Sequence, residues 1–382
     1  MRISPLLPGG CLGIIGAGQL GRMLAQAATS MGYRVAVLSP DPDEPAAQIA
    51  HEVVIGSYDD PVALGSLAEC SDRLTLEFEN IPAEPLYELS GRIEISPSPC
   101  VLAVAQDRLL EKSTMTALGL PIAGYSEIRA PGDGQAAADR WGFPLVVKTA
   151  RSGYDGKGQR IVHSMADLEE AIKLLRPLPL IAEQFIDFRG EASILVARSA
   201  RGQVVTYPLI ANTHRHHILD LSVCPANEPL HVEEQATAIA RTVAEGLQLV
   251  GLLCVELFIG RDDRLLINEL APRPHNSGHL TIEAFSPSQF TQVVRAVCGL
   301  PLATPVQLRP AAMVNLLGEE WGHGKPDWNA ALALPGVSLH LYGKREPKPG
   351  RKMGHLTALA ENSAKAAELA VSARDALRGS RR

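Results

Sequence analysis

Two glutamates of a predicted β-hairpin, Glu256 and Glu269, are the first residues whose types and spacing point to chemistry. Apolar segments lie on both sides of Asp262-Asp263, and a two-residue turn there would place the glutamates directly opposite each other on one face. Like charges so placed destabilise a hairpin unless a cation lies between them. Mg²⁺ takes one or two carboxylates together with phosphate oxygens, and Asn268 offers a further oxygen. The hairpin therefore predicts a magnesium site, with a solvent-exposed charged hairpin as the alternative.

Lys148 gives a second chemical signal. It lies in a Val-rich strand, where a buried ammonium group needs an anionic partner, and the glycine-rich segment 152–159 follows shortly after it. A lysine beside such a loop suits nucleotide phosphates. The order of residues is not that of a P-loop, so the loop would have to close over a nucleotide as a lid. A plain hairpin with an exposed lysine is the alternative.

A third signal is the segment 271–279, which follows the hairpin and reads Ala-Pro-Arg-Pro-His-Asn-Ser-Gly-His. It is too rich in proline and polar donors to be core, and a loop of this kind beside a metal usually touches substrate. The histidines at His214, His216 and His217 lack the carboxylate-flanked spacing of zinc ligands, so we reject zinc there.

The glycines Gly16, Gly18 and Gly21 form a dinucleotide-binding fingerprint between an apolar strand and a helix. The fingerprint alone is weak evidence. The following strand ends in Ser-Pro before Asp41, so an acidic residue for ribose recognition is displaced. Two interpretations stay open here, a nicotinamide-dependent oxidoreductase and a tight turn whose amides face some other ligand.

The elements that must position these residues alternate between strand and helix. The first hundred residues indicate a parallel sheet, and Pro97-Ser98-Pro99 marks a boundary. The pattern is typical of an α/β protein. Beyond the boundary we expect a helix over 101–119, a hairpin over 143–162, a strand over 180–186, a helix over 233–249, strands over 252–259 and 265–269, and a helix from 362 or 363 to 377.

Composition excludes several classes of protein. With 382 residues, 46% apolar and 20% charged, the chain is expected to form two or three globular domains. It shows no membrane-spanning run and no signal sequence, and its six scattered cysteines indicate reduced cytoplasmic thiols. A net charge of −6 and 4% aromatic residues argue against nucleic-acid binding. The segment from His340 to Arg382 is locally basic, which suits a small anionic ligand or a solvated tail.

Taken together, these motifs resemble those of the ATP-grasp carboxylate–amine ligases. Their order along the whole chain is similar to the branch that carboxylates aminoimidazole ribonucleotide in purine biosynthesis. The resemblance implies an ATP- and Mg²⁺-dependent carbon–nitrogen ligase, which uses bicarbonate through carboxyphosphate and releases ADP and phosphate. The segments that carry the resemblance are 16–23, Gln106-Asp107-Arg108-Leu109, Lys148, 153–159, Glu183-Gln184-Phe185-Ile186, Glu256, Asn268-Glu269, 273–279, Lys344 and 351–355.

The resemblance also implies roles for individual residues. Glu256 and Glu269 would hold Mg²⁺, Glu191 would hold the ribose, and Arg273, His275 and Lys148 would be catalytic, with Arg273 clamping bicarbonate or carboxyphosphate. The ATP site would comprise Arg108, Lys148, Gly153, Tyr154, Asp155, Gly156, Lys157, Gly158, Gln159, Glu183, Gln184, Phe185, Ile186, Glu191, His214, Asn268 and Glu269. The ribonucleotide would contact Tyr154, Asp155, Arg273, His275, Asn276, Lys344 and Arg351.

By the same resemblance we expect three domains, at 1–105, 106–298 and 299–382, with ATP between the two sheet-bearing parts of the middle region and a homodimer in the cytoplasm. The formate-using glycinamide ribonucleotide transformylases have a similar loop but carry Asp where Asn276 stands, and a neutral amide suits a neutral aromatic amine. A non-catalytic nucleotide-sensing module is the remaining alternative. Departures from the pattern are Ala17, Asp262-Asp263 and Lys348, and none of them removes a proposed ligand.

Overall fold

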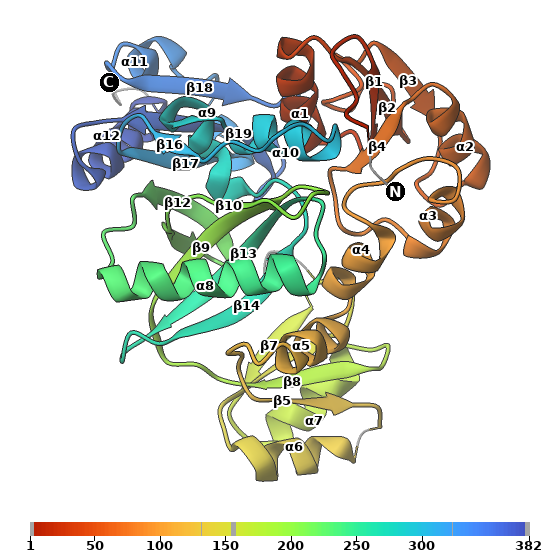
Figure 1. Cartoon of the computed structure of the whole chain (residues 1–382). Helices are drawn as coiled ribbons and strands as arrows, with labels where there is room; N and C mark the ends of the chain where they lie inside the picture. Colours follow the sequence, from red (N-terminus) through yellow and green to blue (C-terminus); the bar gives the residue numbers. More distant parts are fainter. Residues whose placement is uncertain (1–3, 131, 154–157, 323, 379–382) are drawn as a thin grey trace.

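The computed structural model describes residues 4–130, 132–153, 158–322 and 324–378. The chain forms a parallel N-terminal sheet, a small antiparallel sheet and a large antiparallel sheet, with helices packed against each (Figure 1). Over these residues, no helix combines the length and apolar character needed to cross a bilayer. The α/β class predicted from the sequence is confirmed.

The N-terminal part is a parallel sheet surrounded by helices. Its elements are β1 (Cys11–Ile15), α1 (Gln19–Ser30), β2 (Arg34–Ser39), β3 (Glu52–Ile55), α2 (Pro61–Glu69), β4 (Arg73–Leu76) and α3 (Ala83–Leu89). The strand order is β3-β2-β1-β4, and every pair is parallel. The carboxyl ends of β1 and β4 therefore lie at one edge, which brings the glycine turn after β1 beside the residues after β4.

The small sheet carries the Lys148 hairpin. Its elements are β5 (Tyr125–Ile128), α6 (Asp133–Trp141), β6 (Leu145–Thr149), β7 (Gln159–Val162), α7 (Met165–Leu174) and β8 (Leu180–Gln184). The strand order is β5-β8-β6-β7 with all pairs antiparallel, so the predicted hairpin is confirmed. One apolar cluster joins α6 and α7 to the sheet and leaves Lys148 at the strand end that faces the rest of the molecule.

The large sheet contains the glutamate hairpin and joins chain segments on both sides of residue 298. Its strands are β9 (Phe188–Arg198), β10 (Val204–Thr206), β11 (Ile210–Arg215), β12 (Ile218–Cys224), β13 (Gly251–Gly260), β14 (Leu265–Ala271), β17 (Ala311–Leu317), β18 (Val337–Leu341) and β19 (Lys352–Leu359). The order is β14-β13-β9-β11-β12-β17-β19-β18, with β10 on β9. The strand β14 with Glu269 is thus an edge strand.

Helices and short elements cover this sheet. They are α8 (Leu230–Gly246), η1 (Asn276–Leu280), α9 (Thr281–Ala284), β15 (Phe285–Ser286), α10 (Gln289–Val297), β16 (Val306–Gln307), η2 (Gly318–Trp321), α11 (Trp328–Leu332) and α12 (Ser363–Ala376). Figure 1 shows α8 lying across the sheet below the C-terminal elements. One apolar cluster unites Leu12 of β1, Leu195 of β9, Phe290 of α10 and Met313 of β17, and the N-terminal part packs on the large sheet through contacts of α1 and β4 with α10.

The single helix predicted over 101–119 is wrong. The chain forms α4 (Pro99–Gln106) and then α5 (Arg108–Ala117), because Asp107 adopts an extended conformation and its carboxylate accepts hydrogen bonds from Leu109 N and Leu110 N. A side-chain oxygen that binds the first free N–H groups starts a new helix. The break turns α5 so that Arg108 lies against the small sheet, where its N–H donates to Ala150 O over 2.9 Å.

Candidate active site

Glu256 and Glu269 are paired across β13 and β14, so the predicted juxtaposition is confirmed. The turn that produces it is not the predicted one. Residues 261–263 form a three-residue loop closed by a hydrogen bond from Gly260 N to Arg264 O (2.8 Å). That loop shifts the register by one residue, and a β-bulge beside Glu256 shifts it back. Two errors in the expected hairpin geometry therefore cancel at the position where the two glutamates meet.

The two carboxylates have different electrostatic surroundings. His275 Nε2 lies 2.9 Å from Glu256 Oε1. Burial raises the pKa of Glu256, but the charge of His275 outweighs it and lowers that pKa to about 2. Burial and the charge of Glu256 raise the pKa of Glu269, and Arg108, 3.9 Å away, offsets this only in part. Glu269 thus lacks a full counter-charge.

The donor set fits Mg²⁺. Over the residues that the structure describes, no group of three or more His, Cys, Asp or Glu side chains is arranged to hold a metal ion. Two carboxylates on one hairpin face are what Mg²⁺ takes from a protein when nucleotide phosphates and water supply its other ligands. Glu256 and Glu269 would hold the ion, and the incompletely neutralised Glu269 is the observation that supports this fit.

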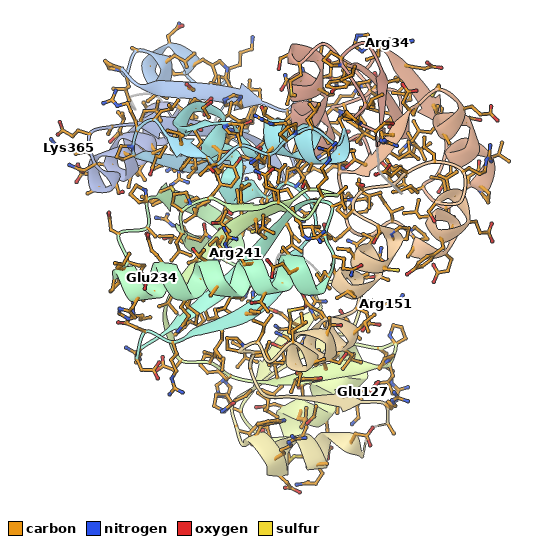
Figure 2. The ribbon with its side chains drawn as sticks, in the orientation of Figure 1. Arg34, Glu127, Arg151, Glu234, Arg241 and Lys365 are labelled. Carbon is orange, nitrogen blue, oxygen red and sulfur yellow. The ribbon has the colours of Figure 1, made fainter. Side chains whose placement is uncertain are left out.

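Lys148 and Arg108 present positive charge opposite the glutamates. Lys148 Nζ lies 2.8 Å from Glu183 Oε2 of β8. Arg108 donates to Thr149 O (3.2 Å) and Gly153 O (2.9 Å), which ties α5 to the start of the glycine loop. Nearby, Arg151 pairs with the helix-starting Asp107 over 3.0 Å, and Figure 2 shows Arg151 at the junction between α4 and the small sheet.

The remaining residues predicted for the nucleotide lie around this junction. Gln159 begins β7 and pairs with Lys148, while Phe185, predicted for the adenine pocket, follows β8 and is partly exposed. His214 Nδ1 lies 2.8 Å from Glu191 Oε2. Burial lowers the pKa of His214, but Glu191 outweighs it and the net direction is upward. The loop-tip predictions Tyr154, Asp155, Gly156 and Lys157 lie outside the described residues; Gly153, Gly158, Gln184, Ile186 and Asn268 are described.

The predicted anion clamp Arg273 already has one carboxylate partner. Its Nε and Nη2 atoms both donate to Glu79, which follows β4 in the N-terminal part, with 2.9 Å from Nη2 to Oε1. Its Nη1 donates to Pro274 O over 3.1 Å. Burial lowers the pKa of Arg273, but Glu79 outweighs it, so the guanidinium stays charged. The edge of the guanidinium that carries Nε and Nη2 is therefore occupied by Glu79.

Asn276 is held by a residue that sequence reasoning missed. Its Nδ2 donates to Asn315 Oδ1 (3.0 Å), and Asn315 Nδ2 donates back to Asn276 Oδ1 (2.6 Å). An aspartate at position 276 would leave Asn315 Oδ1 without its donor, which is costly in a buried site. The pair therefore favours a neutral amide at this position.

Lys344 and Arg351 approach the site from the C-terminal segment. Lys344 Nζ donates to Lys352 O over 2.8 Å, and Arg351 Nη1 donates to Glu346 O over 3.1 Å. Burial, with Arg351 as the next contribution, lowers the pKa of Lys344 to about 8. The neighbouring Gly343 O accepts from Gln48 Nε2 (2.9 Å), which fixes this segment to the N-terminal part.

The glycine fingerprint binds an internal carboxylate. Glu77 Oε1 accepts from Gly18 N (2.8 Å), and Glu77 Oε2 accepts from Gly21 N (3.0 Å). A Cβ on Gly18 would lie 2.7 Å from Glu77 Oε1, so a larger residue there would displace this carboxylate. Glu77 occupies the place that a cofactor pyrophosphate would take at this helix terminus. The oxidoreductase interpretation therefore loses its only support, and the open alternative of another ligand is resolved in favour of Glu77.

Two other residues missed from the sequence are Glu111 and Lys112 of α5. Both side chains are fully buried, and both bind the backbone of β14 on either side of Glu269. The only available signal was a Glu-Lys pair in an amphipathic helix, a pattern that is usually solvent-exposed.

Matches to known families divide the chain in the same order as the fold. Residues 10–106 match the ribonucleotide synthetase preATP-grasp domain, residues 113–290 match the ATP-grasp domain, and residues 311–369 match the phosphoribosylaminoimidazole carboxylase C-terminal domain. The fold and the site thus define an ATP-grasp ligase.

Full-length relatives narrow this class. The chain is 42% identical over 352 residues to an N5-carboxyaminoimidazole ribonucleotide synthase of Bacillus subtilis, covering 92% of each chain. The ADP complex of the Staphylococcus aureus N5-carboxyaminoimidazole synthetase superposes with a TM-score of 0.92 at 37% identity, covering 97% of this chain and 99% of that one. The Aspergillus clavatus enzyme in complex with ADP and 5-aminoimidazole ribonucleotide superposes with a TM-score of 0.88 at 31% identity, covering 96% of this chain and 98% of that one. This chain belongs to the N5-carboxyaminoimidazole ribonucleotide synthase family of ATP-dependent ligases in purine biosynthesis.

The Glu77 contacts generate a stability prediction. Glu77→Ala leaves the N–H groups of Gly18 and Gly21 without their acceptor, at a cost of about 1–3 kcal/mol for each buried donor. We expect a lower melting temperature for Glu77→Ala, an intermediate value for Glu77→Gln, and no change for the exposed Glu88→Ala in the same part of the chain. Equal melting temperatures for Glu77→Ala and the unmodified protein would show that these hydrogen bonds do not stabilise the turn.

Proposed function

We propose that this chain uses ATP and bicarbonate to carboxylate 5-aminoimidazole ribonucleotide, giving N5-carboxyaminoimidazole ribonucleotide, ADP and phosphate through carboxyphosphate. The observation that carries the proposal is the placement of Glu256 and Glu269 opposite each other on β13 and β14, with the positive charge of Arg273, which follows β14, acting on Glu256. A fungal relative crystallised with ADP and aminoimidazole ribonucleotide supports both the nucleotide and the acceptor.

The reaction balances in two steps. A bicarbonate oxygen attacks the γ-phosphorus of ATP, the bond to the β–γ bridging oxygen breaks, and ADP leaves. The amine nitrogen of the ribonucleotide then forms a bond to the carboxyl carbon, phosphate leaves, and the amine loses a proton. The first step is needed because bicarbonate is a poor electrophile without a leaving group.

The residues divide this work by charge. Lys148 and Arg108 would bind nucleotide phosphates, and Arg273 would orient bicarbonate with the guanidinium edge that Glu79 leaves free. Mg²⁺, when bound at Glu256 and Glu269, would neutralise charge on the β- and γ-phosphates. His275, held by Glu256, donates a hydrogen bond and orients that carboxylate.

The ribonucleotide would lie between the N-terminal part and the C-terminal segment. Lys344 and Arg351 would hold its 5′-phosphate. Asn276, held in place by its hydrogen bonds with Asn315, would face its amine. The carboxylates Glu77 and Glu79 border the same region, since Glu77 interacts with the charges of Arg273 and Lys344. The division into domains at 105 and 298, the lid, the homodimer and the cytoplasmic location stay predictions.

Release of ADP tests the proposed function. With Mg²⁺-ATP and bicarbonate, we expect aminoimidazole ribonucleotide to stimulate ADP release strongly and isotopic bicarbonate to enter the product. A parallel reaction with glycinamide ribonucleotide and formate should give no stimulation. Stimulation by the glycinamide pair alone would move the activity to the formate-using relatives, and nucleotide binding without ADP release would leave a sensing module.

The metal assignment is tested at Glu269. Glu269→Gln keeps the shape of the side chain but removes one of two carboxylates, so we expect Mg²⁺-dependent turnover to fall by about a hundredfold or more. Glu234→Gln is the matched control, because Glu234 is exposed on α8, as Figure 2 shows. Mg²⁺ titration of ADP release provides the measurement, and unchanged activity in Glu269→Gln would remove the metal role.

The lowered pKa of Lys344 predicts a pH dependence. The ammonium group is charged below about pH 8 and neutral above it, so phosphate binding weakens as pH rises. We expect the KM for the ribonucleotide to rise between about pH 7 and about pH 9, with little change in the KM for ATP. Lys344→Arg keeps the charge and should flatten this rise. The same slope in Lys344→Arg would place the titrating group elsewhere.

A further inference from the structure

Lys112 is a buried cation without an assigned role. Its side chain is 2% exposed, and it projects from α5 between the small and the large sheet. Its Nζ donates to Asn268 O (2.8 Å) and to Ile267 O (3.3 Å) of β14 and lies 3.8 Å from Glu183 Oε1. These carbonyls flank the β-bulge that sets the position of Glu269. A buried lysine costs free energy unless its charge is used.

Glu183 is shared by two lysines. Its Oε2 accepts from Lys148 Nζ over 2.8 Å, whereas its Oε1 has no hydrogen-bond partner among the described residues and lies 3.8 Å from Lys112 Nζ. Burial raises the pKa of Glu183, but Lys112 and then Lys148 outweigh it and lower that pKa to about 2. The two lysines thus hold Glu183 in its charged form despite its burial.

The two lysines differ in their freedom to move. Lys112 is fixed by two backbone carbonyls of β14 and is almost fully buried. Lys148 has a hydrogen bond only to Glu183 among the described residues, and it lies at the end of β6 beside the glycine loop. Nucleotide phosphates would attract Lys148 away from Glu183, and the charge of that carboxylate would then be balanced mainly by Lys112, with a smaller contribution from Arg108.

We propose that Lys112 is a positioning residue of the nucleotide site, which neutralises Glu183 so that Lys148 is free to bind phosphates. The inference rests on the proposed function in one respect, namely that the ligand is an adenine nucleotide. The role of Lys112 concerns binding of the nucleotide phosphates and not of the base.

Calorimetric titration with ADP tests this role in the full-length protein. Lys112→Met removes the charge and keeps most of the volume, so we expect the Kd for ADP to rise by at least about tenfold. Binding of adenosine should be unchanged, because adenosine has no phosphate to draw Lys148 away. An unchanged Kd for ADP would overturn the proposal.

A double-mutant cycle separates charge balance from a structural effect. In the Glu183→Gln background there is no anion to neutralise, so adding Lys112→Met should change the Kd for ADP by less than about threefold. The same tenfold loss in both backgrounds would contradict the proposal and show that Lys112 acts by holding β14. The double variant loses one positive and one negative buried charge, so it can be compared with Glu183→Gln even if Lys112→Met alone does not fold, and a tenfold loss in that comparison would contradict the proposal.

Arg374→Met is the matched control for loss of a buried cation. Arg374 lies on α12, is 6% exposed and pairs with Asp220 of β12. We expect this variant to lower the melting temperature and leave the Kd for ADP unchanged. A failure of the unmodified protein to bind ADP would refute the proposed function, whereas normal binding with no effect of Lys112→Met would refute the Lys112 role alone.

Discussion

Two carboxylates placed face to face on one hairpin are the constraint on which the rest of the site depends. Glu256 and Glu269 repel each other across β13 and β14, and a sheet tolerates this only when cations surround the pair. The surrounding charges come from distant segments, with His275 after β14 and Arg108 from α5. The fold therefore brings α5 and the segment after β14 to the two carboxylates, and Arg108 offsets the negative charge at Glu269 only in part.

Because of this constraint, the residues around the two glutamates are held by ion pairs as well as by apolar packing. Arg273 is held by Glu79, Lys148 by Glu183, and both carboxylates belong to other elements than their partners. Each of these ion pairs places a cation against a carboxylate from a separate element of the fold.

The sequence predicts the α/β class, most helices and strands, and the opposition of the two glutamates, because these follow from local periodicity and residue type. The turn at 261–263 and the break at Asp107 were not predicted, since both depend on backbone hydrogen bonds that the pattern does not show. Lys112 and Asn315 were missed for a different reason. Each becomes informative only when a distant strand supplies its partner, as β14 does for Lys112.

The glycine turn after β1 shows how one backbone device can take different ligands. Free N–H groups at a helix start attract any anion, and a glycine fingerprint only allows the anion to approach closely. In this chain β1 and β4 are neighbours, so the carboxylate of Glu77 reaches Gly18 and Gly21 from within the protein. The same turn then serves to fix the end of β4, and Glu79, two residues further on, is thereby placed to hold Arg273. The feature that suggests a cofactor site in the sequence binds, in the structure, a carboxylate of the protein itself.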